Sequence, residues 1–335
     1  MIALSFFFFS YIIIMKFNLL NESSYSIKKA IKYLKNNKLV GLKTETVYGI
    51  ACDPSNIYSI KKLYELKKRP LYNPLIIHVN NISLAKKISY IGKDSKLIID
   101  KFWPGPLTLI LRKKKTNLIH DFATSGLNSV AIRMPQSRVM QKIISGLQKP
   151  IAAPSANQSG YVSSTDANHV IDSFGNKIDL VIDSGRSDFG LESTIIDMTS
   201  RPYQIKRLGI VDKKMISDKT QLEISFNNSN GEKNVKQLNS PGQLNKHYAP
   251  HTPLRINIVK PDSDDAFLNY GTNIITKHQP TLNLSKSSNL SEAAYNLFDF
   301  LRKLDKLKKK RIVVAPIPNI GIGKTINERL ARASF

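Results

Sequence analysis

Three short polar segments, each placed where an apolar run ends, constrain the fold of this chain most strongly. They are residues 43–49 (KTETVYG), 67–75 (KKRPLYNPL) and 153–160 (APSANQSG). Each sets hydroxyls, amides or cations beside glycine or proline, so that the backbone can approach a ligand closely. Loops of this composition at the ends of buried strands predict a polyanion site at the edge of a β-sheet.

The composition is that of a soluble globular protein. The chain has 335 residues, 41% hydrophobic and 22% charged, which is enough for one large domain or two ordinary ones. Its net charge of +25 suggests nucleic acid or acidic lipid as partners. However, the excess is mostly lysine, and clusters such as 113–115 have few aromatic residues nearby. We interpret the charge as a solvated basic surface, with weak, salt-sensitive contact to tRNA as the alternative.

The cysteine count and the N-terminus bear on location. A single cysteine, Cys52, excludes an internal disulfide, and we predict a cytoplasmic protein in which it packs in the core. Residues 1–14 are apolar, with no basic residue before them and no cleavage pattern after them. They are fewer than the ~20 apolar residues that span a bilayer. We interpret them as a mis-assigned start or an apolar leader, with translation beginning at Met15 and no stable membrane association; a membrane anchor is the alternative.

Helical and strand patterns alternate along the chain, which predicts the α/β class. Helical spacing of apolar residues predicts helices at 24–36, 58–68, 291–304 and 326–333. Short apolar runs predict strands at 39–42, 75–79, 107–111, 130–134, 151–153, 180–183, 193–197, 255–259, 273–276 and 311–315. Shifts in composition predict a first domain at 15–212, a polar linker at 213–253 and a small C-terminal domain at 254–335.

The basic segment has the residue types that hold phosphate. Lys67 and Arg69 follow a predicted helix, and Pro70 and Pro74 stiffen the loop. Arginine offers a bidentate fork to phosphate oxygens and lysine a mobile charge, while Asn73 adds an amide. The alternative is a solvated helix end whose charges suit the helix dipole. The paired prolines and the strand that follows favour a binding site.

The other two segments are less specific. The hydroxyls and amide of Ser155, Asn157 and Ser159 lie within a few residues of one another and can cradle an anion, although such a loop also caps the helix that follows. Thr44 and Thr46 flank a carboxylate at a strand end, which suits recognition of a small polar substrate. A plain turn with exposed threonines is the alternative there.

Several common catalytic motifs are absent from the sequence. It has no G-x-x-x-x-G-K-[ST] phosphate loop, no His/Cys metal cluster and no G-x-S-x-G motif. We therefore expect no metal site built by the protein alone. Positioning and charge stabilisation are expected to carry most of the catalysis.

The order of the motifs resembles that of the YrdC-like family in its long, two-domain form. The shared segments are 43–49, 67–75, 102–108 (FWPGPLT), 131–135 (AIRMP), 153–160, 192–197 (ESTIID), 240–250 (SPG-x4-HYAP) and 321–333. Each is modest alone, but the ordered set is very specific. The resemblance implies a twisted, open, mixed and largely parallel sheet around a large basic cavity. A small Rossmann-like α/β domain would follow, with the segment 247–250 closing over the cavity.

The resemblance also implies a nucleotidyltransferase reaction. The enzyme would make threonylcarbamoyl-AMP and pyrophosphate from L-threonine, bicarbonate and ATP, with Mg²⁺ accompanying the nucleotide. A separate transferase complex would then use the product to form threonylcarbamoyladenosine in tRNA.

The same resemblance assigns site residues one by one. For L-threonine they are Thr44, His78, Arg133, Ala153 and Ser193. Arg133 would pair the threonine carboxylate. For ATP they are Lys67, Arg69, Asn73, Ser129, Ser155, Asn157, Ser163 and Arg207. Lys67 and Arg69 are the expected catalytic residues.

Two other functions stay open at this point. One is an RNA-binding or nucleotide-binding module that uses the same cavity without catalysis; the charge of +25 favours it and the scarcity of aromatic residues near the basic clusters opposes it. The other is a carbamoyl-adenylate transferase in metalloenzyme maturation. Such proteins carry zinc-finger and acylphosphatase-like segments, which this cysteine-poor chain lacks.

Overall fold

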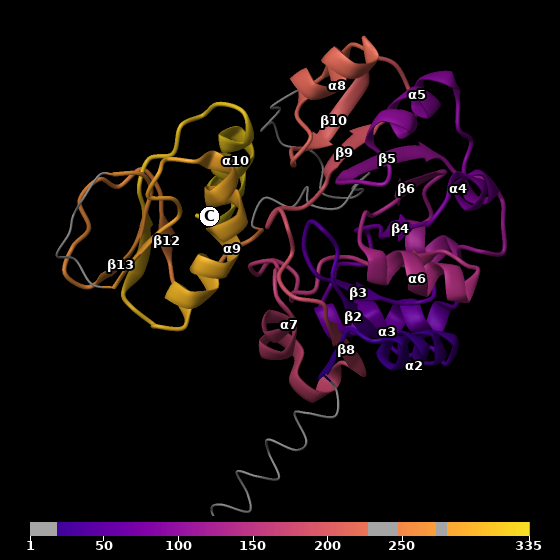
Figure 1. The fold of residues 1–335 in the computed structure, drawn as a ribbon, viewed down its shortest axis with the longest axis horizontal. Helices are drawn as coiled ribbons and strands as arrows, with labels where there is room; N and C mark the ends of the chain where they lie inside the picture. The colour runs from indigo at the N-terminus through magenta and orange to yellow at the C-terminus, as the bar shows by residue number, and fades with distance from the viewer. Residues whose placement is uncertain (1–18, 227–246, 273–279, 335) are drawn as a thin grey trace, which may run out of the picture.

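Two sheets form the framework of the larger, N-terminal part of the chain (Figure 1). The computed structural model describes residues 19–226, 247–272 and 280–334. The strand orders are β1-β8-β2-β3 and β11-β10-β9-β5-β6-β4-β7. Bridges from Gly49 to Ser155 and from Cys52 to Ala152 join the two sheets. The strands are β1 Leu19–Asn21, β2 Val40–Leu42, β3 Gly49–Ala51, β4 Ile76–His78, β5 Leu107–Arg112, β6 Ser129–Arg133, β7 Ile151–Ala152, β8 Leu180–Asp183, β9 Thr194–Asp197, β10 Tyr203–Arg207 and β11 Ile224–Ser225.

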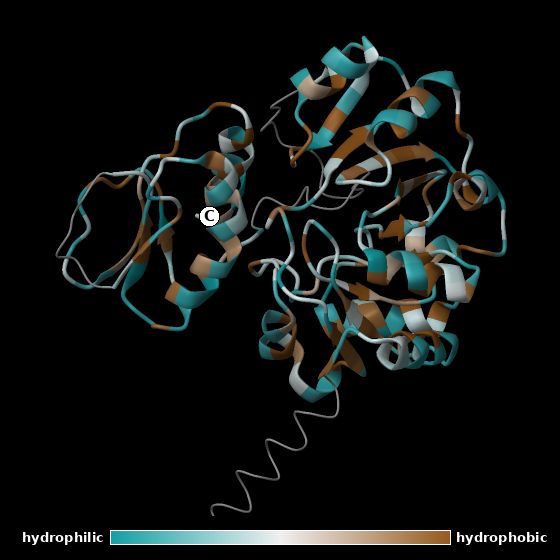
Figure 2. Cartoon of the chain, viewed as in Figure 1, coloured by the Kyte–Doolittle hydropathy of each residue, from teal (hydrophilic) through white to brown (hydrophobic). Residues whose placement is uncertain are grey.

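Helices pack against these sheets with their apolar sides. They are α2 Ser24–Lys35, α3 Ile57–Lys67, α4 Ile82–Ile88, α5 Lys93–Phe102, α6 Arg138–Leu147, α7 Ala167–Phe174 and α8 Lys213–Thr220, with short 3₁₀ turns at Asp121–Thr124 and Gly175–Lys177. In α2, Ile27, Ala30 and Leu34 are buried, and Ser23 caps the first turn. The predicted helices at 24–36 and 58–68 are confirmed. Figure 2 shows the brown, hydrophobic strands inside and teal bands on the helices.

The seven-stranded sheet is mixed, as predicted, but it is not largely parallel. Parallel pairs are β10 with β11, β5 with β9 and β4 with β6. Antiparallel pairs are β9 with β10, β5 with β6 and β4 with β7. The expectation of a largely parallel sheet is therefore wrong here. One reason is chain length, because residues 198–202 between β9 and β10 are too few for the crossover that parallel neighbours need.

The first part of the predicted linker is folded. Residues 213–220 form α8, whose first turn is capped by Asp212, and Ile224–Ser225 pair with β10 as strand β11. Ile216 and Ile224 are buried, at 0% and 1% exposure. The start of the predicted linker thus contains regular secondary structure, and the boundary at 213 stays a prediction. The polar composition concealed a helix whose buried residues are Ile216 and Thr220, of which only Ile216 is apolar.

A second, smaller α/β unit follows, at residues 254–272 and 280–334. Its strands pair in parallel in the order β12-β15-β13-β14. The elements are β12 Leu254–Arg255, β13 Asp265–Asn269, β14 Thr281–Asn283, α9 Leu290–Asp305, β15 Arg311–Val314 and α10 Ile322–Ala333. Figure 1 shows α9 and α10 between this sheet and the larger domain. A parallel sheet with helices agrees with the expected Rossmann-like unit.

Parts of this unit differ from the prediction. The strand expected at 255–259 ends early, since Asn257 has a φ of 61°, a left-handed conformation that breaks a strand. β13 and β14 were not predicted. β13 begins with Asp265 and ends with Asn269, both buried, so its polar ends hid the apolar pattern. Helix α10 begins at Ile322 rather than at 326.

The two domains share a hydrophobic core. The core of the C-terminal unit includes Val47, Val162 and Leu191 from the larger domain. Val47 lies within the segment 43–49, and Val162 follows the segment 153–160. Nearby, the hydroxyl of Tyr161 donates a 2.7 Å hydrogen bond to Asp305 on α9. The C-terminal domain therefore packs directly against loops predicted to bind substrate.

Some expectations lie outside the described residues. These are the apolar run 1–14, Met15, the strand at 273–276 and residues 227–246 of the linker. The domain boundaries stay predictions. No helix in the described part of the chain has the length and apolarity to cross a membrane. Cys52 is fully buried, which raises the pKa of its thiol and agrees with a packing role.

The folded segment at 213–225 gives a first prediction. Ile216→Ala should lower the free energy of unfolding by about 2–5 kcal/mol, because it opens a cavity under α8. Met215→Ala, at an exposed position one residue earlier, is the matched control and should cost far less. Chemical denaturation measures both. Equal, small effects would mean that α8 does not pack on the larger domain.

Candidate active site

The segment 43–49 is a tight turn with its threonines facing inward. The hydroxyl of Thr44 donates to the Val47 carbonyl at 2.6 Å and accepts from the backbone N–H groups of Thr46 and Val47, each at 3.2 Å. The two threonine hydroxyls lie 2.8 Å apart. Thr44 and Thr46 are 3% and 0% exposed. The alternative of a plain turn with exposed threonines is therefore wrong.

Arg133 connects this turn to the sheet. Its Nη1 donates to the Thr46 hydroxyl at 2.8 Å and its Nε to the Gly105 carbonyl at 3.2 Å. Its Nη2 lies 2.7 Å from Oε1 of Glu45, and both side chains are buried. The angles at that ion pair do not meet those of a hydrogen bond. Arg133 has five N–H groups, so it keeps donors for a ligand carboxylate.

Strand register brings two further polar side chains beside Arg133. His78 on β4 and Thr108 on β5 are its direct neighbours in the sheet. Thr108 shares a 2.8 Å hydrogen bond with Ser193. Burial and the charge of Arg133 lower the pKa of His78 to about 3, so the ring is neutral at neutral pH. The Nδ1 of His78 has no hydrogen-bond partner among the described residues.

Two more arginines complete the polar wall. Arg69 donates from Nε to the Asn73 carbonyl at 3.0 Å and from Nη2 to the Asn73 amide oxygen and the Pro74 carbonyl, each at 2.7 Å. Arg207 donates from Nε and Nη2 to the Ser193 carbonyl at 3.0 and 2.9 Å. Both guanidinium groups bond to uncharged partners, so they keep their positive charge for a ligand.

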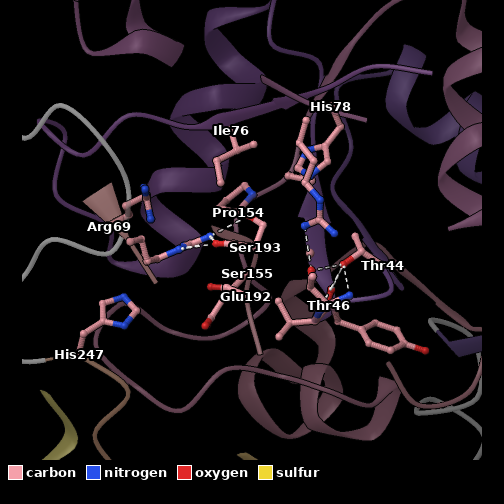
Figure 3. Close-up of a pocket in the computed structure, with 16 residues that line it drawn as sticks. Thr44, Thr46, Arg69, Ile76, His78, Pro154, Ser155, Glu192, Ser193 and His247 are labelled. Atoms are coloured by element: carbon pink, nitrogen blue, oxygen red, sulfur yellow. Dashed lines mark hydrogen bonds between the residues drawn. The ribbon is translucent and has the colours of Figure 1, made fainter. Parts of the chain in front are cut away.

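These side chains line one pocket, which Figure 3 shows in close-up. Arg69 and His247 lie on one side, Thr44 and Thr46 on the other, and Ser193 lies between them. The empty space in this pocket is about 560 Å³ when its open mouth is counted. Of the predicted residues, the lining includes Thr44, Arg69, His78, Arg133, Ala153, Ser155, Ser193 and Arg207.

Lys67 is not part of that lining. Its side chain is 1% exposed, and its ammonium donates to the carbonyls of Ser155, at 2.6 Å, and of Asn157. The Ser159 N–H in turn donates to the Lys67 carbonyl at 2.8 Å. Burial, with the charge of Arg69 added, lowers the pKa of Lys67 well below its ordinary value. Lys67 therefore fixes the loop 153–160 on the end of α3, and its side chain does not reach the pocket lining. Its expected place near the phosphates stays a prediction.

Four other predicted residues also lie off the lining. The Asn157 amide donates to the carbonyls of Gln158 and Tyr161, and Asn73 holds Arg69. Ser163 donates to Glu192. Ser129 stands at the opposite end of β6 from Arg133, roughly 13 Å along the strand, so the structure does not bring it to the pocket.

Sequence reasoning missed some lining residues, above all Glu192 and His247. Glu192 opens the segment 192–197, and His247 opens the segment 247–250, so both stood in motifs that carried the resemblance. The expected closing of 247–250 over the cavity agrees with His247 in the lining. Burial lowers the pKa of His247 to about 3, which leaves its ring neutral.

The pocket is positively charged and offers no cage for a metal. Its lining has three arginines, and its carboxylate, Glu192, is held by Arg329 at 3.0 Å. Among the described residues, no group of three or more His, Cys, Asp or Glu side chains could hold a metal ion. Convergent cations, hydroxyls and a neutral imidazole suit an anionic ligand bound beside a small polar one.

The contacts of Lys67 give a second prediction. Lys67→Ala should lower the free energy of unfolding by about 1–3 kcal/mol, because the buried Asn157 carbonyl loses its donor and the Ser155 carbonyl keeps only the Asn157 N–H, at 3.1 Å. Lys61→Ala, an exposed position on the same helix, should have little effect. Denaturation curves compare the two. An unchanged stability in Lys67→Ala would show that these contacts do not hold the loop.

Family models match both parts of the chain. The model described as Telomere recombination, for the Sua5, YciO and YrdC proteins, matches residues 32–209. The model described as the C-terminal domain of threonylcarbamoyl-AMP synthase matches residues 204–334.

Relatives match over nearly the full length. A threonylcarbamoyl-AMP synthase of Pyrococcus abyssi is 33% identical over 328 residues, 92% of this chain and 94% of the relative. That of Bacillus subtilis is 32% identical over 330 residues, 94% of each chain. The crystal structure of Pyrococcus abyssi Sua5 complexed with L-threonine has a TM-score of 0.86 at 31% identity and covers 95% of this chain and 97% of its own. These matches favour the synthase over an RNA-binding module or a carbamoyl-adenylate transferase. The chain therefore belongs to the threonylcarbamoyl-AMP synthases, in the two-domain form of the YrdC-like family.

Proposed function

We propose that the pocket between 43–49, 153–160 and the ends of β4 and β6 is where this chain forms threonylcarbamoyl-AMP. One observation carries the proposal: Arg69, Arg133 and Arg207 line a single pocket together with serine and threonine hydroxyls. Arg133 and Arg207 are buried and Arg69 is half-buried, and cations gathered in one pocket suit anionic ligands. L-threonine and ATP supply a carboxylate and a triphosphate, which match such a set of cations.

L-threonine would occupy the side of the pocket near Thr44 and Arg133. The carboxylate would pair with Arg133, whose other donors already fix it to Thr46 and Gly105. The neutral His78 adds a polar atom without adding charge. The complex of the Pyrococcus abyssi relative with L-threonine supports the same ligand class for this chain.

The ATP phosphates would occupy the opposite side, against Arg69 and Arg207. Ser155 lies between Arg69 and the two threonines in Figure 3, and Lys67 fixes the backbone of its loop. Lys67 therefore acts through the loop 153–160, and Arg69 is the cation that contacts phosphate. Asn73, Asn157 and Ser163 act in the same indirect way, because each holds a lining residue or the loop.

The chemistry requires two bond-forming steps. The threonine amine and bicarbonate condense to a carbamate with loss of water. A carbamate oxygen then bonds to the α-phosphorus of ATP, and the bond to the β-phosphate oxygen breaks to release pyrophosphate. The protein holds the two substrates side by side and stabilises the charge of the leaving pyrophosphate with Arg69 and Arg207.

Mg²⁺ would enter with the nucleotide. The one carboxylate in the lining, Glu192, already accepts from Arg329 and Ser163, so phosphate oxygens and water would ligate the ion. We also propose that the protein is cytoplasmic and that a separate tRNA-modifying transferase complex uses the product. Weak contact of the basic surface with tRNA would depend on salt.

The two sides of the pocket can be told apart kinetically. Arg69→Gln should raise the KM for ATP by about tenfold or more, since a charge-assisted hydrogen bond is lost, with little change in the KM for L-threonine. Pyrophosphate release measures both. Arg138→Gln, an exposed position outside the lining, is the control. A KM for ATP equal to wild type would remove Arg69 from the phosphate site.

Arg133 needs a variant that leaves no buried charge behind. Arg133→Gln combined with Glu45→Gln should raise the KM for L-threonine by about tenfold or more, while the KM for ATP changes little. Glu45→Gln alone, in which Arg133 remains, is the matched reference. An equal rise in both KM values would contradict the assignment of Arg133 to the threonine carboxylate.

A further inference from the structure

A buried arginine of the C-terminal domain contacts a residue that lines the active-site pocket. Arg329, on α10, is 1% exposed. Its Nε donates to Oε2 of Glu192 at 3.0 Å, and its Nη2 donates to the Leu208 carbonyl at 2.7 Å. Its guanidinium also lies 4.8 Å from the ring centre of Tyr248. Arg329 is therefore enclosed by the larger domain and by the segment that closes over the pocket.

Glu192 places a negative charge in the pocket wall. It lines the pocket with Arg207 and His247, and its other oxygen accepts from the Ser163 hydroxyl. Burial alone would raise the pKa of Glu192, but Arg329, followed by Arg207, brings it below its ordinary value. Glu192 is thus ionised at neutral pH, beside the cation that the proposed function assigns to the ATP phosphates.

Such a carboxylate opposes a triphosphate unless a cation balances it. Glu192 interacts electrostatically with Arg207. Without a counter-ion, Glu192 would offset the positive charge of Arg207 and weaken its attraction for the phosphates. Arg329 supplies the positive charge that offsets Glu192, from a position outside the pocket lining. Glu328, the preceding residue, also forms an ion pair with Arg329, but it forms an ion pair with Arg332 as well. Glu328 therefore does not fully neutralise the charge of Arg329.

The C-terminal domain also fixes the second partner of Glu192. Arg302, on α9, donates to the carbonyls of Val162, at 2.6 Å, and Ser163, at 3.2 Å. It donates to the Ser164 hydroxyl at 3.1 Å as well. Both groups that hold the Glu192 carboxylate are therefore held by, or belong to, the C-terminal domain.

We propose that Arg329 is a positioning residue for the reaction: it is the counter-ion with which the C-terminal domain keeps Glu192 from opposing the ATP phosphates at Arg207. This inference rests on the proposed function. It assigns to the second domain a specific electrostatic role at the nucleotide side of the pocket. It also predicts that the need for Arg329 disappears when Glu192 carries no charge.

The test compares Arg329→Met, Arg329→Lys and Arg329→Met combined with Glu192→Gln, with Glu192→Gln as the reference. Pyrophosphate release gives kcat and both KM values, and calorimetric titration with ATP gives its Kd without turnover. Arg329→Met should raise the KM and Kd for ATP by about tenfold or more and leave the KM for L-threonine near wild type. Arg329→Lys, which keeps the charge, should restore most of the ATP affinity. The double variant should bind ATP as Glu192→Gln does.

Arg186→Met is the matched control for domain docking. Arg186 also joins the two domains, with Nη2 donating to the Tyr295 carbonyl at 2.7 Å and Nη1 3.4 Å from Asp299, but it does not line the pocket. Its loss should leave the affinity for ATP unchanged.

Several results would overturn the inference. One is a wild-type KM for ATP in Arg329→Met with only kcat reduced, which is the effect of a smaller folded fraction. Another is an equal loss of ATP affinity in Arg186→Met. If Arg329→Met does not fold, the double variant decides: weaker ATP binding than Glu192→Gln, or failure to fold, means that Arg329 is only structural. Failure of the proposed function is distinct, because wild-type protein would then release no pyrophosphate.

Discussion

The burial of positive charge is the constraint on which the rest of this structure depends. Arg133, Arg207 and Lys67 are buried and Arg69 is half-buried, and each bonds to oxygen atoms there. The partners are carbonyl, hydroxyl and amide oxygens. Those of Arg69 lie in its own loop, whereas Arg133 bonds to Thr46 and Lys67 bonds to the carbonyls of Ser155 and Asn157, on segments far away in the sequence. These contacts help to fix the shape of the pocket, and the remaining donors of the arginines are available to the proposed ligands.

The framework places these loops by simple means. Register between β4 and β6 sets His78 beside Arg133, and the bridge from Gly49 to Ser155 brings the first and third polar segments together. The C-terminal domain contributes to the same arrangement, because its core includes Val47 and Val162 from these loops. The C-terminal domain is thus part of the structural support of the candidate active site.

The family, helices α2, α3, α9 and α10 and half of the pocket lining could be predicted from the sequence, because ordered motifs and apolar spacing are local properties. The contacts that each side chain makes could not be predicted from the sequence. Lys67 is a residue type that binds phosphate, yet its ammonium donates to backbone carbonyls. This contact depends on how two segments that are distant in the sequence pack together. The partnership of Glu192 with Arg329 spans 137 positions and two domains, so no local pattern could reveal it. Helix α8 was missed because polar residues surround its buried Ile216.

The most direct test of this account is a crystal structure of the full chain with L-threonine and a non-hydrolysable ATP analogue. We expect the threonine carboxylate within hydrogen-bond distance of Arg133 and the triphosphate against Arg69 and Arg207, with Glu192 still paired to Arg329. A triphosphate bound outside this pocket, or a threonine carboxylate that contacts Arg69 instead of Arg133, would contradict it.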